Sequence, residues 1–308
     1  MMRAIVRSAL VVVGLTLAAI PIPGSAGTAT TCSRVGATLN VDIDLATARV
    51  TIVRSGNNIQ VVDRGTIVPC TGGASTVTNT DTVTVDDNTM GSPHVAVSLM
   101  GGPFAPGATT AGEGASPEIE FDIFLGTGSL SDLFAMRGSA GADDIRLGLF
   151  GAGGSFVNLN GDGDVDITVG NEDLAVISGL DGSDLLTGTG GPAFDGPYIG
   201  RISFSGGNGN DILEAGEGRA IIRGQTGRDL MVGGPDLDTL RGGPGPDDAD
   251  GRGRGDFISG QGGGDDLRGR GGPDRLEGGP GGDALRGGPG RDTCQGGPGQ
   301  DTESGCEA

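Results

Sequence analysis

The chain has 308 residues, among them 65 Gly and 16 Pro, and its 40 acidic side chains against 20 basic ones give a net charge of −20. This charge argues against a nucleic-acid partner, which needs a basic protein face. Aromatic residues make up 3 % of the chain, Trp is absent and His94 is the single His. This composition argues against a large aromatic-lined pocket and against a multi-histidine metal site.

Residues 1–26 have the features of a secretory signal peptide. Arg3 and Arg7 precede an apolar run that extends from Ala9 to Ile20, and small residues follow up to Ala26. The run is shorter than the ~20 residues that a transmembrane helix needs. We expect cleavage after Ala26, with Ala29 as the second choice and a retained anchor as the alternative. The mature chain is then secreted, extracellular and without a transmembrane segment.

Residues 27–137 form a β-rich N-terminal region. Apolar and polar side chains alternate in several short runs, as they do in β-strands. The runs lie at 38–45, 50–53, 82–85, 95–97 and 119–123. A sandwich-like cap and an irregular continuation of a solenoid both fit this pattern. We favour the solenoid, because the tract runs into the following repeats without a linker.

Residues 138–205 form a degenerate repeat region. The stretches GSAGADDIR and GLDGSDLLT each place an Asp at their sixth position, and these residues are Asp143 and Asp184. Asp184 is in frame with the regular repeats that follow, whereas Asp143 is out of frame. We treat both as candidate metal ligands.

A nine-residue period organises residues 206–304 as 11 units without an insertion, and only 305–308 lie beyond it. Ten units carry Asp at the sixth position: Asp211, Asp229, Asp238, Asp247, Asp256, Asp265, Asp274, Asp283, Asp292 and Asp301. Nine units carry an apolar residue at the eighth position, whereas Glu303 in the last unit indicates that the repeat ends there. One apolar residue in nine is too sparse for a helix face. It fits a three-residue strand followed by a six-residue turn.

The GG-x-G-x-D-apolar pattern closely resembles the hemolysin-type, or RTX, calcium-binding nonapeptide. The resemblance covers about a third of the chain. It implies a right-handed parallel β-roll in which two nonapeptides make one coil, with Ca²⁺ held between Gly-rich turns by Asp carboxylates and backbone carbonyls. The expected fold is therefore all-β, with a C-terminal β-roll, or β-solenoid, behind the β-rich N-terminal region.

Elementary electrostatics agrees with calcium as the cofactor. Asp residues two repeats apart would stack ~4.8 Å apart, the spacing of neighbouring strands. Such a column of carboxylates repels itself unless cations lie between its members. Ca²⁺ prefers six to eight oxygen ligands, and Gly lets a turn direct its carbonyls toward an ion. One column would hold six Asp from Asp211 to Asp301, and the other four from Asp238 to Asp292, with Ala220 in the preceding place. Counting the gaps gives about eight ions.

Four Cys suggest disulfides in an exported protein, and they are Cys32, Cys70, Cys294 and Cys306. Three pairings are possible, and four free thiols are the alternative. Clustering near the two ends of the chain favours Cys32–Cys70 and Cys294–Cys306.

These features predict calcium ion binding by an exported repeat protein whose roll folds on Ca²⁺. A structural or adhesive cell-surface protein that uses the roll as a spacer is the alternative, followed by a secreted hydrolase with a repeat tail. We expect no enzymatic activity, because one His cannot supply an HExxH motif and no Gly-x-Ser-x-Gly motif occurs. A protein or surface partner is not identified by the sequence.

Overall fold

The computed structural model describes residues 30–44, 48–76, 80, 82–87, 94–101, 119–125, 132–150, 154–159, 167–170, 174–190, 194 and 196–307. The expected signal peptide therefore lies outside the described residues. In the described part the fold is all-β, with one short 3₁₀ turn at Leu99–Gly101. No helix there is long and apolar enough to cross a membrane.

The strands form two sheets, A and B, that run the length of the molecule. Sheet A has the order β1-β2-β6-β8-β12-β11-β10-β14-β17-β19-β21-β23-β25-β27, and sheet B has the order β26-β24-β22-β20-β18-β16-β13-β9-β7-β3-β4-β5. The bounds in sheet A are β1 Thr30–Val35, β2 Thr38–Ile43, β6 Thr82–Asp87, β8 Glu120–Phe124, β10 Asp144–Phe150, β11 Gly154–Asn158, β12 Ile167–Gly170, β14 Leu185–Thr187, β17 Ile212–Glu214, β19 Leu230–Val232, β21 Asp248–Asp250, β23 Asp266–Arg268, β25 Ala284–Arg286 and β27 Thr302–Ser304, with β15 Gly196–Pro197 paired to β10. The bounds in sheet B are β3 Arg49–Ser55, β4 Asn58–Asp63, β5 Thr66–Val68, β7 His94–Ser98, β9 Leu133–Arg137, β13 Leu174–Asp181, β16 Arg201–Asn208, β18 Ala220–Thr226, β20 Thr239–Pro244, β22 Phe257–Gly262, β24 Arg275–Glu277 and β26 Thr293–Gln295.

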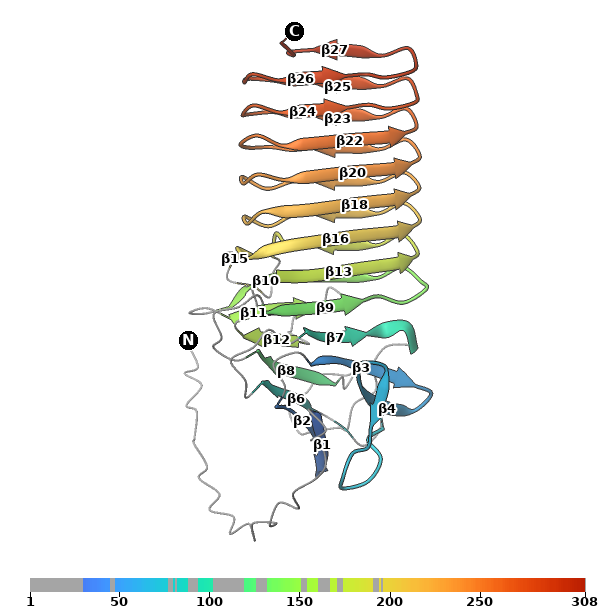
Figure 1. The fold of residues 1–308 in the computed structure, drawn as a ribbon, viewed down its shortest axis with the longest axis vertical. Helices are drawn as coiled ribbons and strands as arrows, with labels where there is room; N and C mark the ends of the chain where they lie inside the picture. Colours follow the sequence, from blue (N-terminus) through green and yellow to red (C-terminus); the bar gives the residue numbers. More distant parts are fainter. Residues whose placement is uncertain are drawn as a thin grey trace, which may run out of the picture.

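The C-terminal third is a regular β-roll with one strand of each coil in each sheet. Ile212 pairs in parallel with Leu230 in sheet A, and Thr239 with Phe257 in sheet B, so that each strand pairs with the one two repeats further along. The expected pair of nonapeptides per coil is confirmed. Figure 1 shows these coils stacked as successive layers up to the C-terminus. In sheet A the strands have the expected three residues, whereas β18, β20 and β22 extend into the Gly-rich turn.

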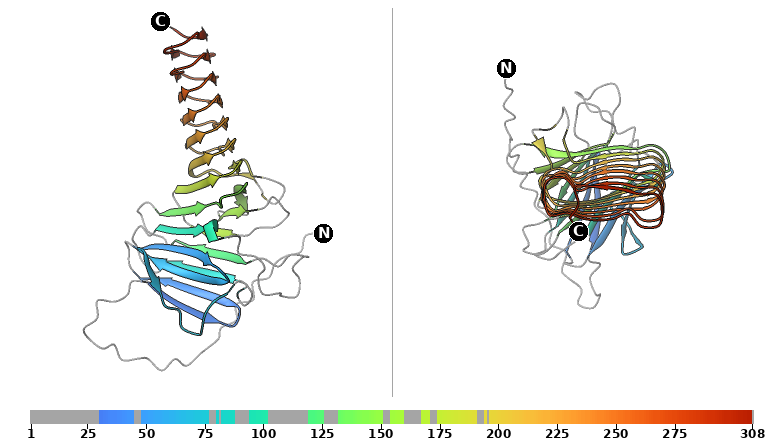
Figure 2. Two further views of the ribbon diagram at one scale, coloured as in Figure 1. Left: turned by 90° about the vertical axis from the view of Figure 1, so that its right-hand side faces the viewer. Right: turned by 90° about the horizontal axis from the view of Figure 1, so that it is seen from above.

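The N-terminal region continues the same solenoid with wider coils. His94 pairs in parallel with Leu133, and Leu174 pairs in parallel with Arg201, so each of these coils contains more chain than two nonapeptides. The continuation that the sequence favoured is confirmed, and the sandwich-like cap is not formed. Figure 2 shows the narrow roll rising from this broader part of the molecule. The regular coils are narrow because two nonapeptides leave no room for loops between strands.

Antiparallel strands interrupt the parallel stacking at two places. The β11–β12 pair lies between the coil strands β10 and β8 in sheet A. At the N-terminal end, β1 pairs with β2 in sheet A and the β3–β4–β5 meander ends sheet B. These additions cover the first coil, where an open solenoid end would otherwise expose unpaired backbone groups.

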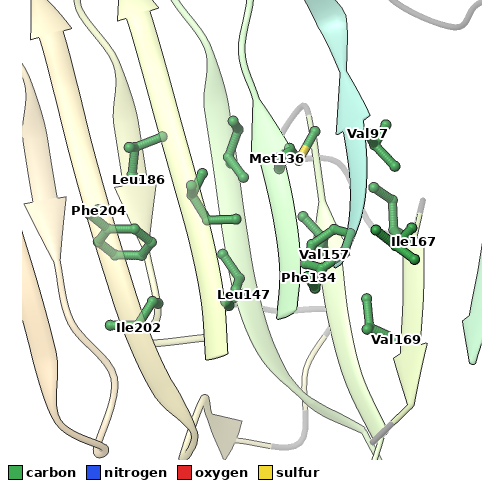
Figure 3. Packing of buried hydrophobic residues seen from close by; sticks show 14 of the residues in the cluster. Val97, Phe134, Met136, Leu147, Val157, Ile167, Val169, Leu186, Ile202 and Phe204 are labelled. Carbon is green, nitrogen blue, oxygen red and sulfur yellow. The ribbon is translucent and has the colours of Figure 1, made fainter. Parts of the chain in front are cut away.

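The hydrophobic core lies between the two sheets. In the wide coils each strand points two or three large side chains inward, and Figure 3 shows Phe134, Met136, Ile202 and Phe204 among them. In the roll each strand contributes one inward side chain, at the eighth position of its repeat. Those that are completely buried are Leu213, Ile222, Met231, Leu240, Ala249, Ile258, Leu267, Leu276 and Leu285. The predicted core positions of the roll are therefore confirmed.

Candidate metal-binding columns

Eight aspartates of sheet A stack into one hydrogen-bonded column, which we call column 1. In each step the backbone N–H of one Asp donates to the Oδ1 atom of the Asp in the next coil, at 2.9–3.0 Å. The members of column 1 are Asp143, Asp184, Asp211, Asp229, Asp247, Asp265, Asp283 and Asp301. Asp143 thus joins the column although it is out of frame, because its coil contains insertions and the pairing of β10 with β14 brings it level with Asp184.

Four aspartates beside sheet B form the shorter column 2. The same contact joins them at 2.8 Å, and the members are Asp238, Asp256, Asp274 and Asp292. Ala220 keeps its place at the start of the column, where its backbone N–H donates to Asp238 Oδ1 at 2.7 Å. Ala220 supplies no carboxylate, so column 2 lacks the ligand that its first coil would otherwise provide.

The second carboxylate oxygen of most column members is buried and has no protein partner. Among the described residues the Oδ2 atom accepts no hydrogen bond in Asp184, Asp211, Asp229, Asp247, Asp256, Asp265, Asp274, Asp283 and Asp292. A buried carboxylate oxygen without a partner costs several kcal/mol, roughly 1–3 even for a neutral group. The columns therefore require a cation or a proton at these atoms.

Three column members depart from this pattern, and one of them, Asp301, is only partly buried at the C-terminal end of column 1. Asp143 is satisfied by the backbone N–H of Ser139 at 2.8 Å and by the Ser139 hydroxyl at 3.1 Å. Asp238 Oδ2 accepts from the backbone N–H of Gly234 at 2.6 Å. Of the twelve candidate ligands, Asp143 and Asp238 have the least need of a metal ion in the geometry seen here.

In the repeats that carry Asp at the sixth position, the first Gly leaves room for the carboxylate of its own repeat. A Cβ atom built on Gly206 would lie 2.0 Å from Asp211 Oδ2 and 2.8 Å from the carbonyl oxygen of Gly224 in the next coil. On Gly242 it would lie 2.1 Å from Asp247 Oδ2. Carboxylate and carbonyl oxygens thus border one small space in each coil, and an all-oxygen environment suits a hard cation such as Ca²⁺.

Burial raises the pKa values of nine column carboxyls. It brings the pKa of Asp247 and Asp256 to about 7, from a usual 3.8. The pKa of Asp184, Asp229, Asp265 and Asp274 rises to about 6 for the same main reason. Repulsion between neighbouring Asp side chains adds to the shift at Asp247, where Asp229 and Asp265 both contribute. The carboxylates with a raised pKa are therefore poised to exchange a proton for a metal ion.

No three His, Cys, Asp or Glu side chains converge on one point within the described ranges. Carboxylates from successive coils can approach an ion only one or two at a time. The remaining ligands must come from backbone carbonyls of the turns, as calcium sites permit.

Both expected disulfides are present. Cys32 of β1 is bonded to Cys70 with Cα atoms 4.5 Å apart, and Cys294 of β26 is bonded to Cys306 with Cα atoms 5.8 Å apart. The first ties β1 to the segment after β5, and the second ties the chain end to the last coil.

The comparison with protein families agrees with this geometry. The RTX calcium-binding nonapeptide repeat, in four copies, matches residues 205–240 and 268–303. The C-terminal part of the chain therefore contains RTX-type repeats. The matched segments hold seven of the column aspartates, whereas Asp247, Asp256 and Asp265 lie between the two segments, and RTX repeats are calcium-binding by description. No curated protein and no solved structure matches the chain.

Sequence reasoning missed side chains that support the turns of this repeat protein. The Ser183 hydroxyl accepts from the backbone N–H of Asn210 at 3.1 Å, and Asn210 Oδ1 accepts from the N–H of Arg228 at 2.8 Å. These residues occupy the fifth position of their repeats. The signal was present as small polar residues at that position, but the strong Asp and Gly periodicity obscured it.

Proposed function

We propose that this repeat protein binds Ca²⁺ along columns 1 and 2, with ions held between successive coils, and that the roll folds as the ions bind. One observation carries the proposal: nine buried Asp Oδ2 atoms have no hydrogen-bond partner among the described residues. Ca²⁺ would neutralise the carboxylates and supply each of these oxygens with a partner.

The ligand set follows from the same geometry. Column 1 offers unsatisfied carboxylates from Asp184 to Asp283, and column 2 offers them from Asp256 to Asp292. Carbonyl oxygens of the first Gly in neighbouring coils border the same spaces. Because every inner ion would contact two coils, binding at one level favours folding of the next.

We further propose an exported protein without catalytic activity. Two disulfides fit an oxidising compartment, and extracellular calcium modules bind at ~10⁻⁴–10⁻³ M. In a calcium-poor cytoplasm the roll would stay unfolded, and calcium outside the cell would then fold it. The narrow roll projecting from a broader base in Figure 2 suits a rigid, calcium-dependent spacer.

Calcium titration tests this function directly. Far-UV circular dichroism and calorimetry of the purified protein should show a cooperative gain of β-structure with Ca²⁺, several ions bound per chain, and little response to Mg²⁺. Mg²⁺ responds less because it demands a near-octahedral site with shorter bonds. A spectrum that Ca²⁺ leaves unchanged, or two or fewer bound ions, would contradict the proposal.

A further inference from the structure

The outer face of sheet B carries a groove that the Asp columns do not use. Its volume is about 320 Å³, and it lies over β13, β16 and β18. These three strands are consecutive in sheet B and lie one above another in Figure 1. The volume is at the lower end of the range found for small-molecule sites.

The floor of the groove is apolar. Leu174 and Val176 of β13 and Ile221 of β18 line it, and all three side chains are half-buried. They belong to the outward-facing side of the sheet, where the row of Ile221 continues in the later coils as Thr239, Phe257 and Arg275. An aliphatic group laid on this floor would gain ~25 cal/mol for each Å² removed from water.

Three exposed arginines, Arg201, Arg219 and Arg223, line the same groove. Arg201 and Arg219 directly precede the paired residues Ile202 and Ala220, which places their backbones on neighbouring strands about 4.8 Å apart. Two guanidinium groups at this spacing repel each other. Arg223 lies four residues further along β18, at the other end of the groove.

These arginines differ from those on sheet A. There, Arg268 forms ion pairs with Asp248 and Asp266, at 2.5 Å each. Among the described residues none of the three groove arginines forms an ion pair, although Arg219 attracts the carboxylate of Asp238 at longer range. In a chain of net charge −20, this groove is a local concentration of positive charge.

We propose that the groove binds a small amphipathic anion. Its acidic group, of the carboxylate or sulfate type, is held between Arg201 and Arg219, and its aliphatic body covers Leu174, Val176 and Ile221. Guanidinium groups bind such oxyanions through paired charge-assisted hydrogen bonds. The bound anion also removes the repulsion between the two arginines.

Octyl sulfate, below the concentration at which it forms micelles, is a suitable probe. Calorimetric titration of the full, calcium-loaded chain should show one site with at least tenfold higher affinity than for inorganic sulfate or for octyl glucoside. Inorganic sulfate lacks the aliphatic body, and octyl glucoside lacks the charge. Added NaCl should weaken octyl sulfate binding, because the arginines are exposed and salt screens them.

Substitution identifies the site. The double variant R201Q/R219Q should lose about tenfold or more in affinity, since a hydrogen bond to a charged group contributes about 1.5–3 kcal/mol. The matched control Arg291→Gln removes an exposed arginine of a distant repeat and should bind as the unmodified chain does. Circular dichroism of each variant in Ca²⁺ verifies that the roll is folded, so that a folding defect is distinguished from loss of the site.

Three outcomes would overturn the proposal. Equal affinity for octyl sulfate and octyl glucoside would show non-specific adsorption. An equal loss of octyl sulfate affinity in R201Q/R219Q and Arg291→Gln would show that the binding site lies elsewhere. Glu172 and Asp173 precede β13 and lie outside the described residues; binding that arises only after Glu172→Gln and Asp173→Asn would mean that the chain's own carboxylates fill the site.

Discussion

At the scale of single residues, each column Asp performs two tasks with its two oxygens. Oδ1 accepts the backbone N–H of the preceding coil, as Asp247 does from Asp229 at 2.9 Å, and so fixes the stacking of the turns. Oδ2 faces the first Gly of its own repeat, as Asp229 does toward Gly224. The first Gly is therefore required by steric contact and not by a positive φ.

Replacing one of these glycines should destabilise the roll. In Gly224→Ala the new Cβ would lie 2.2 Å from Asp229 Oδ2, so either the carboxylate or the turn must move. We expect a loss of about 1–3 kcal/mol in the free energy of unfolding and a higher calcium concentration at the folding midpoint. Thermal melts and calcium titrations measure both.

Gly262→Ala is the matched control, because a Cβ at that position would meet nothing within 4 Å. This variant should melt close to the unmodified chain. Equal destabilisation of the two variants would show that the contact with the carboxylate is not the cause.

The raised pKa values predict opposite pH dependences with and without metal. Burial raises the pKa of Asp247 and Asp256 to about 7. Without metal, the folded chain then holds more protons than the unfolded chain between about pH 4 and pH 7, so stability falls as pH rises through this window. Melts in EDTA should give a higher midpoint near pH 5 than near pH 8. With saturating Ca²⁺ the order should reverse, because protons compete with the ion.

Asp247→Asn separates the two effects of this carboxyl. The amide oxygen can still accept the hydrogen bond from Asp229, but the side chain no longer ionises. We expect a flatter pH dependence in EDTA and weaker calcium binding. A metal-free midpoint that rises with pH, in either protein, would contradict the assigned direction of the pKa shift.

At the scale of the elements, strands of three residues are stable only within the stack. Strands such as β23 and β25 each bury one large side chain, Leu267 and Leu285 respectively, and pair with a strand on either side. Stability is then a sum over neighbouring coils, and the ends of the array need protection. On sheet A, Arg268 forms an ion pair with Asp248 and Arg286 forms one with Asp266, and each pair links successive coils from outside.

The C-terminal end is closed by residues that replace a missing coil. The N–H of Gly296 donates to Glu303 Oε1 at 2.7 Å, where the preceding coils use a backbone carbonyl of the next coil. The N–H of Glu307 donates to the carbonyl of Asp292 at 2.8 Å, which takes the place of a further strand. Glu303, predicted to end the roll, thus does so by hydrogen bonding.

Removing the terminal disulfide should release this cap. Cys306→Ser opens a loop of 12 residues, for which the loop-entropy model gives a loss near 3 kcal/mol. We expect faster amide hydrogen exchange in β26 and β27, with β16 to β20 unaffected, because each coil depends mainly on its neighbours. The double variant C32S/C70S should leave the last coils protected. Uniform loss of protection along the whole roll would contradict a local cap.

At the scale of the whole molecule, the means of stabilisation change along one continuous solenoid. The wide coils hold large aromatic and aliphatic side chains, including Phe121, Phe134 and Phe204. The regular coils hold one inward apolar side chain per repeat and two columns of buried carboxylates. The first part can fold on hydrophobic burial, whereas the second requires neutralisation of its charges.

Calcium removal should therefore unfold the molecule in part. In EDTA near pH 8 we expect hydrogen exchange to lose protection throughout residues 206–307 and to retain it in β2, β3, β6 to β9 and β13. Limited proteolysis should cut the same C-terminal segment, and added Ca²⁺ should restore it. Simultaneous loss of protection in both parts would show that the solenoid is one cooperative unit.

The sequence pattern of the repeats was sufficient to predict which residues form the regular part of the two columns. The nine-residue period, together with the coil of two nonapeptides that the RTX resemblance implies, placed Asp211 to Asp301 in two columns and assigned inward positions such as Leu213 and Leu285. The same reasoning could not place Asp143 in column 1. Its coil contains insertions, and only the pairing of β10 with β14 aligns it with Asp184.

The sequence by itself determined the all-β class, the repeat length, the ligand chemistry and the favoured disulfide pairing, since each depends on residues at short, regular spacings. The tertiary structure decided which carboxylate oxygen is left unsatisfied, why Gly224 cannot be Ala, and how the wide coils join the same sheets. It also brought Arg201 and Arg219 together around an apolar groove. Apart from the Gly224–Asp229 contact, which lies within one repeat, these features arise from contacts between coils, and no local pattern encodes them.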